Sequence, residues 1–164
     1  DSGRGTGRAP VRLAQTGPEA RVIGVDQSAN RLERGGRRWL QPPDNLLFLR
    51  ADCTGLWRLV QQAGWQLARH QILYPNPWPK SAHLKRRWQG HPVWPSVLAL
   101  GGELELRSNW PVYLEEVQAA LAISEIDALL APLAVYGEAA TDFEEKYLAS
   151  GQTVWQLTAS LARD

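Results

Sequence analysis

Short apolar runs alternate with helix-like segments along the whole 164-residue chain. The strand-like runs are rich in Val, Ile and Leu, and they lie at residues 21–26, 45–51, 70–74, 103–108 and 153–157. Helix-like segments lie between them, at about 8–16, 28–40, 54–64, 84–99, 111–122 and 142–149. This alternation predicts one α/β domain over residues 1–164, built on a doubly wound, mostly parallel sheet. We expect the last run to be an antiparallel edge strand, whereas the pattern of residues 123–140 predicts no definite state.

Basic residues are concentrated in the middle of the chain, although the net charge is only +1. Residues 53–102 hold six Lys or Arg and no Asp or Glu, whereas residues 103–164 hold eleven acidic and three basic side chains. A segment without carboxylates predicts a surface for an anion, with nucleic acid as the obvious polyanion. The alternative is a buried segment that merely lacks acids.

Several classes of protein are excluded by what the sequence lacks. No signal-peptide pattern and no apolar run of roughly 20 residues is present, so we expect a cytoplasmic protein without a membrane segment. The single cysteine, Cys53, cannot form an internal disulfide or a cysteine-only metal site. The three histidines do not stand at a zinc-binding spacing from it, and we therefore expect no metal.

A glycine-rich turn with the sequence DSGRGTG opens the chain at residues 1–7. Its glycines stand at every second position: Gly3, Gly5 and Gly7. They come just before a predicted helix and allow a ligand to approach the backbone closely, although a plain flexible loop is the alternative. Asp1, Asp26 and Asp52 stand at three strand ends, which fits an adenosine-containing cofactor with its ribose on Asp26 and its adenine near Asp52. The alternative for Asp26 and Asp52 is a helix N-cap.

A stiff proline loop follows the third predicted strand, with the sequence YPNPWPK at residues 74–80. Its three prolines hold Asn76 and Lys80 at the carboxyl end of a strand, where open α/β sheets place their ligand sites. The basic run behind the loop is suited to clamping phosphates, or else it is a solvated helix start. Trp78 and Trp88 are the tryptophans that we expect to face RNA.

Together these motifs resemble the bacterial tRNA (guanine-N7)-methyltransferase family, which has the Rossmann-like class I fold of enzymes that use S-adenosylmethionine. The family has an acid-led glycine loop, a PDPWPK loop followed by a basic segment and, near the C-terminus, a TxFE segment, a glycine and a V-W-x-L strand. This chain carries the counterparts in the same order, at residues 1–7, 74–80, 141–144, 151 and 154–157. The family's N-terminal segment and first strand have no counterpart here, and we expect both to be missing.

The resemblance implies a role for each matching residue. Contacts with S-adenosylmethionine fall on Asp1, Gly3, Gly5, Gly7, Asp26, Asp52 and Asn76. Catalytic roles fall on Asn76 and Lys80, and guanine or tRNA contacts fall on Lys80, Asn109, Thr141, Asp142, Phe143 and Glu144. Contacts to tRNA phosphates fall on His83, Lys85, Arg86 and Arg87. As alternatives, Thr141 is a helix N-cap and Glu144 an exposed acid of the first helical turn.

Two positions depart from the family's pattern, because Asn76 and Asn109 stand where the family has aspartates. Guanine N7 carries an in-plane lone pair, so its methylation needs no general base and relies on proximity and alignment. A carboxylate would still stabilise the charge that develops on the base, so Asn76 predicts a slow enzyme. The alternatives are a degenerate paralogue with little or no tRNA methylation and a methyltransferase for another substrate. The sequence leaves a monomer and a homodimer both open.

Overall fold

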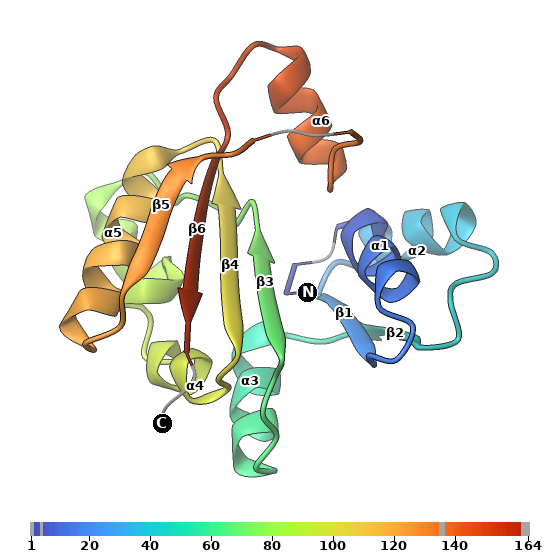
Figure 1. Ribbon diagram of the computed structural model, residues 1–164, viewed down its shortest axis with the longest axis horizontal. Helices are drawn as coiled ribbons and strands as arrows, with labels where there is room; N and C mark the ends of the chain where they lie inside the picture. The colour runs from blue at the N-terminus through green and yellow to red at the C-terminus, as the bar shows by residue number, and fades with distance from the viewer. Residues whose placement is uncertain (1, 4, 135–136, 162–164) are drawn as a thin grey trace.

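Strands separated by helices make up most of the computed structural model, which describes residues 2–3, 5–134 and 137–161 (Figure 1). The strands are β1 (Val22–Asp26), β2 (Leu46–Arg50), β3 (Arg69–Leu73), β4 (Glu103–Ser108), β5 (Ala128–Pro132) and β6 (Trp155–Ser160). The α-helices are α1 (Arg8–Thr16), α2 (Ala29–Arg38), α3 (Cys53–Gln62), α4 (Trp94–Ala99), α5 (Pro111–Ile123) and α6 (Asp142–Ala149). Two short 3-10 helices are η1 (Ser81–Arg86) and η2 (Trp88–Gly90). The predicted α/β alternation is confirmed.

The strands pair in two groups that meet at the start of the glycine-rich turn. β1 and β2 pair in parallel, and the second group has the order β3-β4-β6-β5. β3 and β4 are parallel, whereas β6 runs antiparallel to both of its neighbours. Ser2 lies between the two groups, because its backbone forms parallel bridges to Val25 in β1 and to Ile72 in β3.

The last strand occupies a different position from the one predicted. β6 is antiparallel, as expected, but it lies between β4 and β5 instead of at the edge. The edge strand is β5, which comes from the segment for which the sequence predicted no state. Leu129 of β5 is exposed, and Pro132 has no N–H to offer a further neighbour, so this strand has the character of an edge.

The helix predicted over residues 84–99 is wrong, since η1, η2 and α4 occupy this segment instead. Pro92 and Pro95 remove backbone donors that a continuous helix would need. Gly90 approaches the backbone of Leu84 so closely that a Cβ would lie 2.5 Å from its carbonyl oxygen. The segment therefore folds back on itself and presents much of the basic run on a short, exposed 3-10 helix.

The main apolar core lies between the four-stranded group and helices α3, α4 and α5. Leu104 and Leu106 of β4 are fully buried in this core, and Glu105 between them faces the other side of the sheet. α5 contributes a stripe of buried side chains, namely Tyr113, Leu114, Val117 and Leu121. The opposite face of these strands is polar, which leaves it free to carry the ion pairs described below. Among the described residues, no helix has the length and apolarity needed to cross a membrane.

Candidate active site at the carboxyl edge of the sheet

The glycine-rich turn leaves open space in front of its backbone. Gly3, Gly5 and Gly7 all have positive φ angles, at 83°, 58° and 93°. Residues that carry a Cβ rarely adopt this backbone conformation. A Cβ built on Gly3 or Gly5 would meet no atom within 4 Å. The turn is held at its base, because the Gly3 amide donates to the Val25 carbonyl at 2.9 Å. A ligand therefore has room to lie directly against this backbone, and the turn fits the adenosine-containing cofactor that the sequence predicts.

Asp26 anchors this turn from the end of β1. Its carboxylate is only 2% exposed and accepts the backbone amides of Gly5 at 3.1 Å and Ser28 at 2.8 Å. It also pairs with Arg31 at 3.3 Å. The N-cap of α2 is Ser28, so Asp26 is not the cap that the alternative reading expected.

The structure does not test the predicted cofactor contacts of Asp52 and Asp1. Asp52 is the N-cap of α3 and accepts the Gly55 amide at 2.9 Å, which is the alternative that the sequence left open. A hydrogen bond from the Thr54 hydroxyl lowers the pKa of Asp52 below its usual value. The predicted cofactor contact at Asp1 lies outside the described residues, and the contact at Asp52 stays a prediction.

A cavity of about 410 Å³ lies over the glycine-rich turn. It is lined by Gly3, Gly5, Thr6, Arg8, Arg31, Arg34, Leu73, Thr141, Asp142, Phe143 and Lys146. Five of these residues belong to the predicted site, and they come from opposite ends of the chain. The two ends are joined directly, because the Thr6 hydroxyl donates to the Asp142 carboxylate at 2.6 Å. Asp26, Asp52 and Asn76 are not among the residues that line the cavity.

The predicted substrate segment forms the start of α6, which stands above the edge where β3 and β4 end (Figure 1). Thr141 is the N-cap of α6, since its hydroxyl accepts the Glu144 amide at 3.0 Å. Phe143 is exposed and lines the cavity. Burial alone would raise the pKa of Asp142, but hydrogen bonds from Thr6 and Arg38 outweigh it and lower the pKa.

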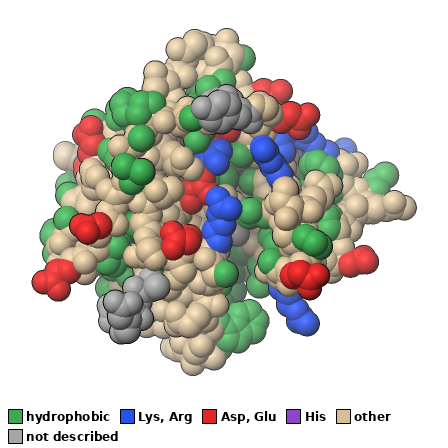
Figure 2. All heavy atoms as spheres, viewed as in Figure 1, with side chains coloured by type: hydrophobic (Ala, Val, Ile, Leu, Met, Phe, Trp, Pro, Cys, Tyr) green, Lys and Arg blue, Asp and Glu red, His purple; other side chains and the backbone are tan. Residues whose placement is uncertain are grey.

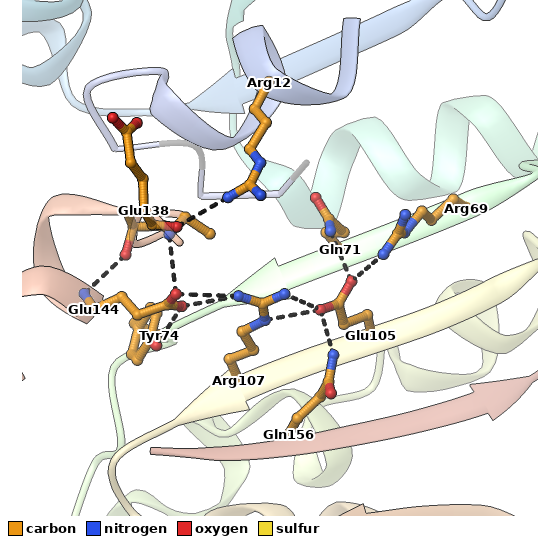
Figure 3. A network of polar contacts seen from close by, with 11 residues as sticks. Arg12, Arg69, Gln71, Tyr74, Glu105, Arg107, Glu138, Glu144 and Gln156 are labelled. Atoms are coloured by element: carbon orange, nitrogen blue, oxygen red, sulfur yellow. Dashed lines mark hydrogen bonds and ion pairs between the residues drawn. The ribbon is translucent and has the colours of Figure 1, made fainter. Parts of the chain in front are cut away.

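Glu144 is buried beneath this segment, at 2% exposure, and has no free face toward solvent. Its carboxylate accepts the Tyr74 hydroxyl at 2.7 Å, the Ala140 amide at 2.9 Å and the Arg107 guanidinium at 3.0 Å (Figure 3). It is therefore not the exposed first-turn acid of the alternative reading. In this geometry Glu144 fastens α6 to the ends of β3 and β4, and its predicted contact with guanine stays a prediction.

Arg107 links Glu144 to a second buried carboxylate, Glu105, on the polar face of the sheet (Figure 3). Burial would raise the pKa of Glu105, but Arg107 and the hydrogen bonds from Gln71 and Arg69 lower it to about 2. Burial and donation to Glu144 raise the pKa of the Tyr74 hydroxyl. The network thus keeps Glu105 ionised and the Tyr74 phenol neutral beneath α6. Sequence reasoning missed Tyr74 and Arg107 because their partners are 70 and 37 residues away.

The proline loop has a strained backbone on both sides of Asn76. Tyr74 and Trp78 have φ angles of 53° and 44°, which bulky side chains seldom adopt. Such strain is found mainly at functional sites, where the surrounding structure enforces it. Asn76 is exposed and its Oδ1 accepts the Trp78 amide at 3.2 Å, so part of the side chain shapes the turn. Lys80 is exposed at the end of the loop.

The predicted RNA-binding residues separate into two environments. Lys85 and Arg86 are exposed on η1, and the Arg86 guanidinium lies 4.8 Å from the centre of the Trp78 ring. His83 packs edge-on against the same ring at 5.4 Å. Arg87 is buried, donates to the Trp78 carbonyl at 3.0 Å and pairs with Glu116 at 2.6 Å. This guanidinium braces the proline loop from inside and is not displayed at the surface.

Trp88 and Asn109 are also engaged by neighbouring side chains. Trp88 is partly buried and packs edge-on against Trp57 at 4.7 Å, so it belongs to the core instead of the expected RNA-facing surface. The Asn109 amide donates to the Gln152 side chain at 2.9 Å. Asn109 is not among the residues that line the cavity, and its role in base recognition stays a prediction.

Cations on the cavity wall were not found from the sequence. They are Arg8, Arg31, Arg34 and Lys146, from α1, α2 and α6. None of them lies in residues 53–102, the segment whose basic residues predict a surface for an anion. The sequence signal that could have indicated them is the spacing of the arginines in α2, because positions three and four residues apart share one side of a helix.

Comparison with known proteins places the chain in a family. The model of a family described as "putative methyltransferase" matches residues 1–157. A tRNA (guanine-N(7)-)-methyltransferase of Halorhodospira halophila is 31% identical over the whole chain and 74% of its own length. One from Nitrosococcus oceani is 26% identical, over 94% of this chain and 67% of its own length. One from Treponema pallidum is 28% identical over 94% of this chain, which spans only 63% of that protein.

Solved structures agree on the fold. The 16S rRNA methyltransferase KamB superposes with a TM-score of 0.70 at 18% identity, covering 99% of this chain and 86% of that one. A 16S rRNA (adenine(1408)-N(1))-methyltransferase from Catenulisporales acidiphilia, solved with its cosubstrate SAM, has a TM-score of 0.66 at 19% identity, covering 100% and 84%. Both likenesses show the class I methyltransferase fold that the sequence predicted. With this fold and a family match over nearly all of its length, the chain belongs to the putative methyltransferase family.

Proposed function

We propose that this protein transfers a methyl group from S-adenosylmethionine to guanine N7 of tRNA. The observation that carries the proposal is the cavity over the glycine-rich turn, which joins Gly3 and Gly5 to the Thr141–Phe143 segment. These two segments are 136 or more residues apart in the chain, and the family's motifs place cofactor contacts on one and substrate contacts on the other. The names of the relatives supply the tRNA substrate.

The chain's own residues have separate tasks in this reaction. S-adenosylmethionine supplies an electrophilic methyl group when it is bound. The open backbone at Gly3 and Gly5 would hold it, with Asp26 fixing the turn through the Gly5 amide. Guanine N7 has its own lone pair, so no side chain has to remove a proton before transfer. Catalysis is then mostly alignment, and the stiff, strained proline loop loses little entropy when it presents Lys80 to the substrate.

The direct test is methylation of unmodified tRNA. The full natural protein is incubated with methyl-labelled S-adenosylmethionine and tRNA, and 7-methylguanine is scored by chain cleavage at the modified base. We expect methylation by the wild type and none by Lys80→Ala. Lys85→Ala is the matched control, because this second exposed lysine lies on η1 and is expected to affect KM for tRNA and not kcat. Equal activity of wild type and Lys80→Ala would remove Lys80 from the catalytic step, whereas a wild type that forms no 7-methylguanine would contradict the proposed function.

A second candidate is a cofactor-binding and RNA-binding protein with little methylation. It is favoured by the two asparagines at positions where the family has aspartates. Asn76 hydrogen-bonds within its own turn, and Asn109 donates to Gln152, so both amides already have partners in the protein. Binding of both S-adenosylmethionine and tRNA without any 7-methylguanine would favour this candidate over the first.

A further inference from the structure

Four cations lie around the cavity on the side formed by α1, α2 and α6. Arg31 and Arg34 belong to α2, Arg8 begins α1 and Lys146 belongs to α6. Asp142 is the one acidic residue among those that line the cavity in the described part of the chain. Figure 2 shows Lys and Arg side chains gathered where α6 approaches the α1–α2 region. This region is separate from the basic run on η1.

Two of these four cations are already paired. Arg31 pairs with Asp26 at 3.3 Å, and Arg8 pairs with Glu145 at 2.9 Å. Within residues 2–3, 5–134 and 137–161, the side chains of Arg34 and Lys146 have neither an ion pair nor a hydrogen bond. Both are exposed, and they come from two different helices. The cavity rim therefore carries two cations whose charge no group in the described part of the chain balances.

Arg34 has other arginines as its neighbours on the surface of α2. Arg34 lies three residues after Arg31 and four before Arg38, so the three guanidinium groups share one side of the helix. Like charges at these spacings destabilise a helix. An ion pair with Asp142 at 2.9 Å compensates the charge of Arg38, and the ion pair with Asp26 compensates that of Arg31. An anionic ligand would relieve Arg34 in the same way.

The position of these cations matches a polyanion that, under the proposed function, would also contact η1. β1 and β3 run in the same direction, since Ser2 is parallel to both. α2 follows the carboxyl end of β1 and η1 follows that of β3, so both basic surfaces lie at the edge where α/β sheets bind ligands. Both free cations are exposed, whereas the cofactor would lie at the glycine floor. A ligand with several charges along its length fits this distribution better than a single carboxylate does.

We propose that Arg34 and Lys146 form a second phosphate-binding site for the RNA backbone, on the α2–α6 side of the cavity. This inference rests on the proposed tRNA substrate. The RNA would then be held by phosphate contacts on two separate surfaces, η1 and the α2–α6 rim. Neutralised phosphates release counterions, so the site predicts a measurable share of the salt dependence of tRNA binding.

The test compares two double variants of the full natural chain with the same change in charge. Arg34→Gln with Lys146→Gln removes the proposed site. Arg21→Gln with Arg37→Gln removes two exposed arginines that do not line the cavity. The affinity for unmodified tRNA is measured against salt concentration by fluorescence anisotropy. We expect the first variant to bind about tenfold more weakly at low salt, with a log–log slope reduced by about 1.5, and the control to keep the wild-type slope.

Calorimetry with S-adenosylmethionine separates the remaining outcomes. A wild-type slope in the first variant, while wild-type tRNA binding is intact, overturns the inference and leaves the proposed function standing. A loss of S-adenosylmethionine affinity with an unchanged tRNA slope assigns the cations to the cofactor's carboxylate and also overturns it. A wild-type protein that binds no tRNA overturns both the inference and the proposed function.

Discussion

The two strand groups of the sheet differ in how they are stabilised. In the four-stranded group, Leu104, Leu106 and Leu157 are fully buried against α3, α4 and α5. In the β1–β2 pair, Leu47 is 56% exposed, and the main apolar core contains no side chain from either strand among the described residues. The difference teaches that one group supplies most of the packing, while the other holds the glycine-rich turn at a thinly packed edge.

The cavity lies where the two groups meet. Its floor comes from the turn before α1, and its upper wall comes from α6, which the buried network of Glu144 fastens to β3 and β4. The shape of the cavity therefore depends on the backbone joint at Ser2 and on the polar face of the four-stranded group. The following variants are expected to separate these contributions.

The largest expected effect is on the packing of the four-stranded group. Leu106→Ala removes a fully buried side chain, and we expect it to lower the free energy of unfolding by about 4 kcal/mol. Leu47→Ala in β2 is the matched control and is expected to change it by less than about 1 kcal/mol. Urea denaturation measures both, and equal losses would show that the two groups contribute alike.

A slightly smaller effect is expected on the polar face. Arg107→Gln leaves Glu105 and Glu144 buried without their shared cation, and we expect a loss of about 3 kcal/mol. Arg69→Gln removes an arginine that also pairs with Glu105 but is half exposed, so about 1 kcal/mol or less is expected. Thermal melts compare the two variants, and an equal effect would show that the buried link to α6 is unimportant.

The joint between the groups is expected to respond to pH through His70. Its side chain contacts the Ser2 hydroxyl at 2.9 Å, and burial lowers the pKa of His70 to about 3 from its usual 6.5. His70 therefore binds a proton below about pH 6.5 in the unfolded chain, but only below about pH 3 in the folded chain. We expect His70 to cost about 3 kcal/mol of stability as the pH falls from 7.5 to 4.

The measurement for this effect is the free energy of unfolding against pH, for the wild type and for His70→Leu. The variant lacks the titrating group, so its stability is expected to fall less steeply over this range. Parallel curves for the two proteins would remove His70 as the cause.

The smallest effect is expected on catalysis in the proline loop. Asn76→Asp restores a carboxylate that would stabilise the positive charge developing on guanine, and a gain of about 2 kcal/mol corresponds to about thirtyfold in kcat. The Asp side chain still accepts the Trp78 amide, so the turn is expected to keep its shape. Single-turnover methylation of tRNA measures the change, with Asn109→Asp as the companion variant. An unchanged rate would indicate that charge at residue 76 is not limiting.

Much of the fold could be predicted because its signals are local. The strand at 103–108 and the helices at 8–16 and 142–149 were predicted with their observed bounds, since alternation, helical periodicity and the cap at Thr141 are properties of neighbouring residues. The three short helices between Ser81 and Ala99 were missed because the basic and apolar residues there suggest one helix, while Pro92, Pro95 and the contact at Gly90 break it.

The candidate site divides in the same way. Its glycine-rich turn and its Thr141–Phe143 segment were identified from motifs, and the structure places them on one cavity. The burial of Glu144 and Arg87 could not be read from residue type, because both are charged and stand in segments that look exposed. Their partners, Arg107 and Glu116, lie 37 and 29 residues away in the chain.

Residue order was enough to predict a strand–helix chain with a glycine-rich turn and a rigid proline loop, because glycine, proline and apolar periodicity act on the backbone within a few residues. Folding in three dimensions decided which strand became the edge, which charged side chains were buried, and which arginines reached the cavity. These outcomes depend on pairings between distant segments, whose energy comes from burial and from charge compensation that no short stretch of sequence contains.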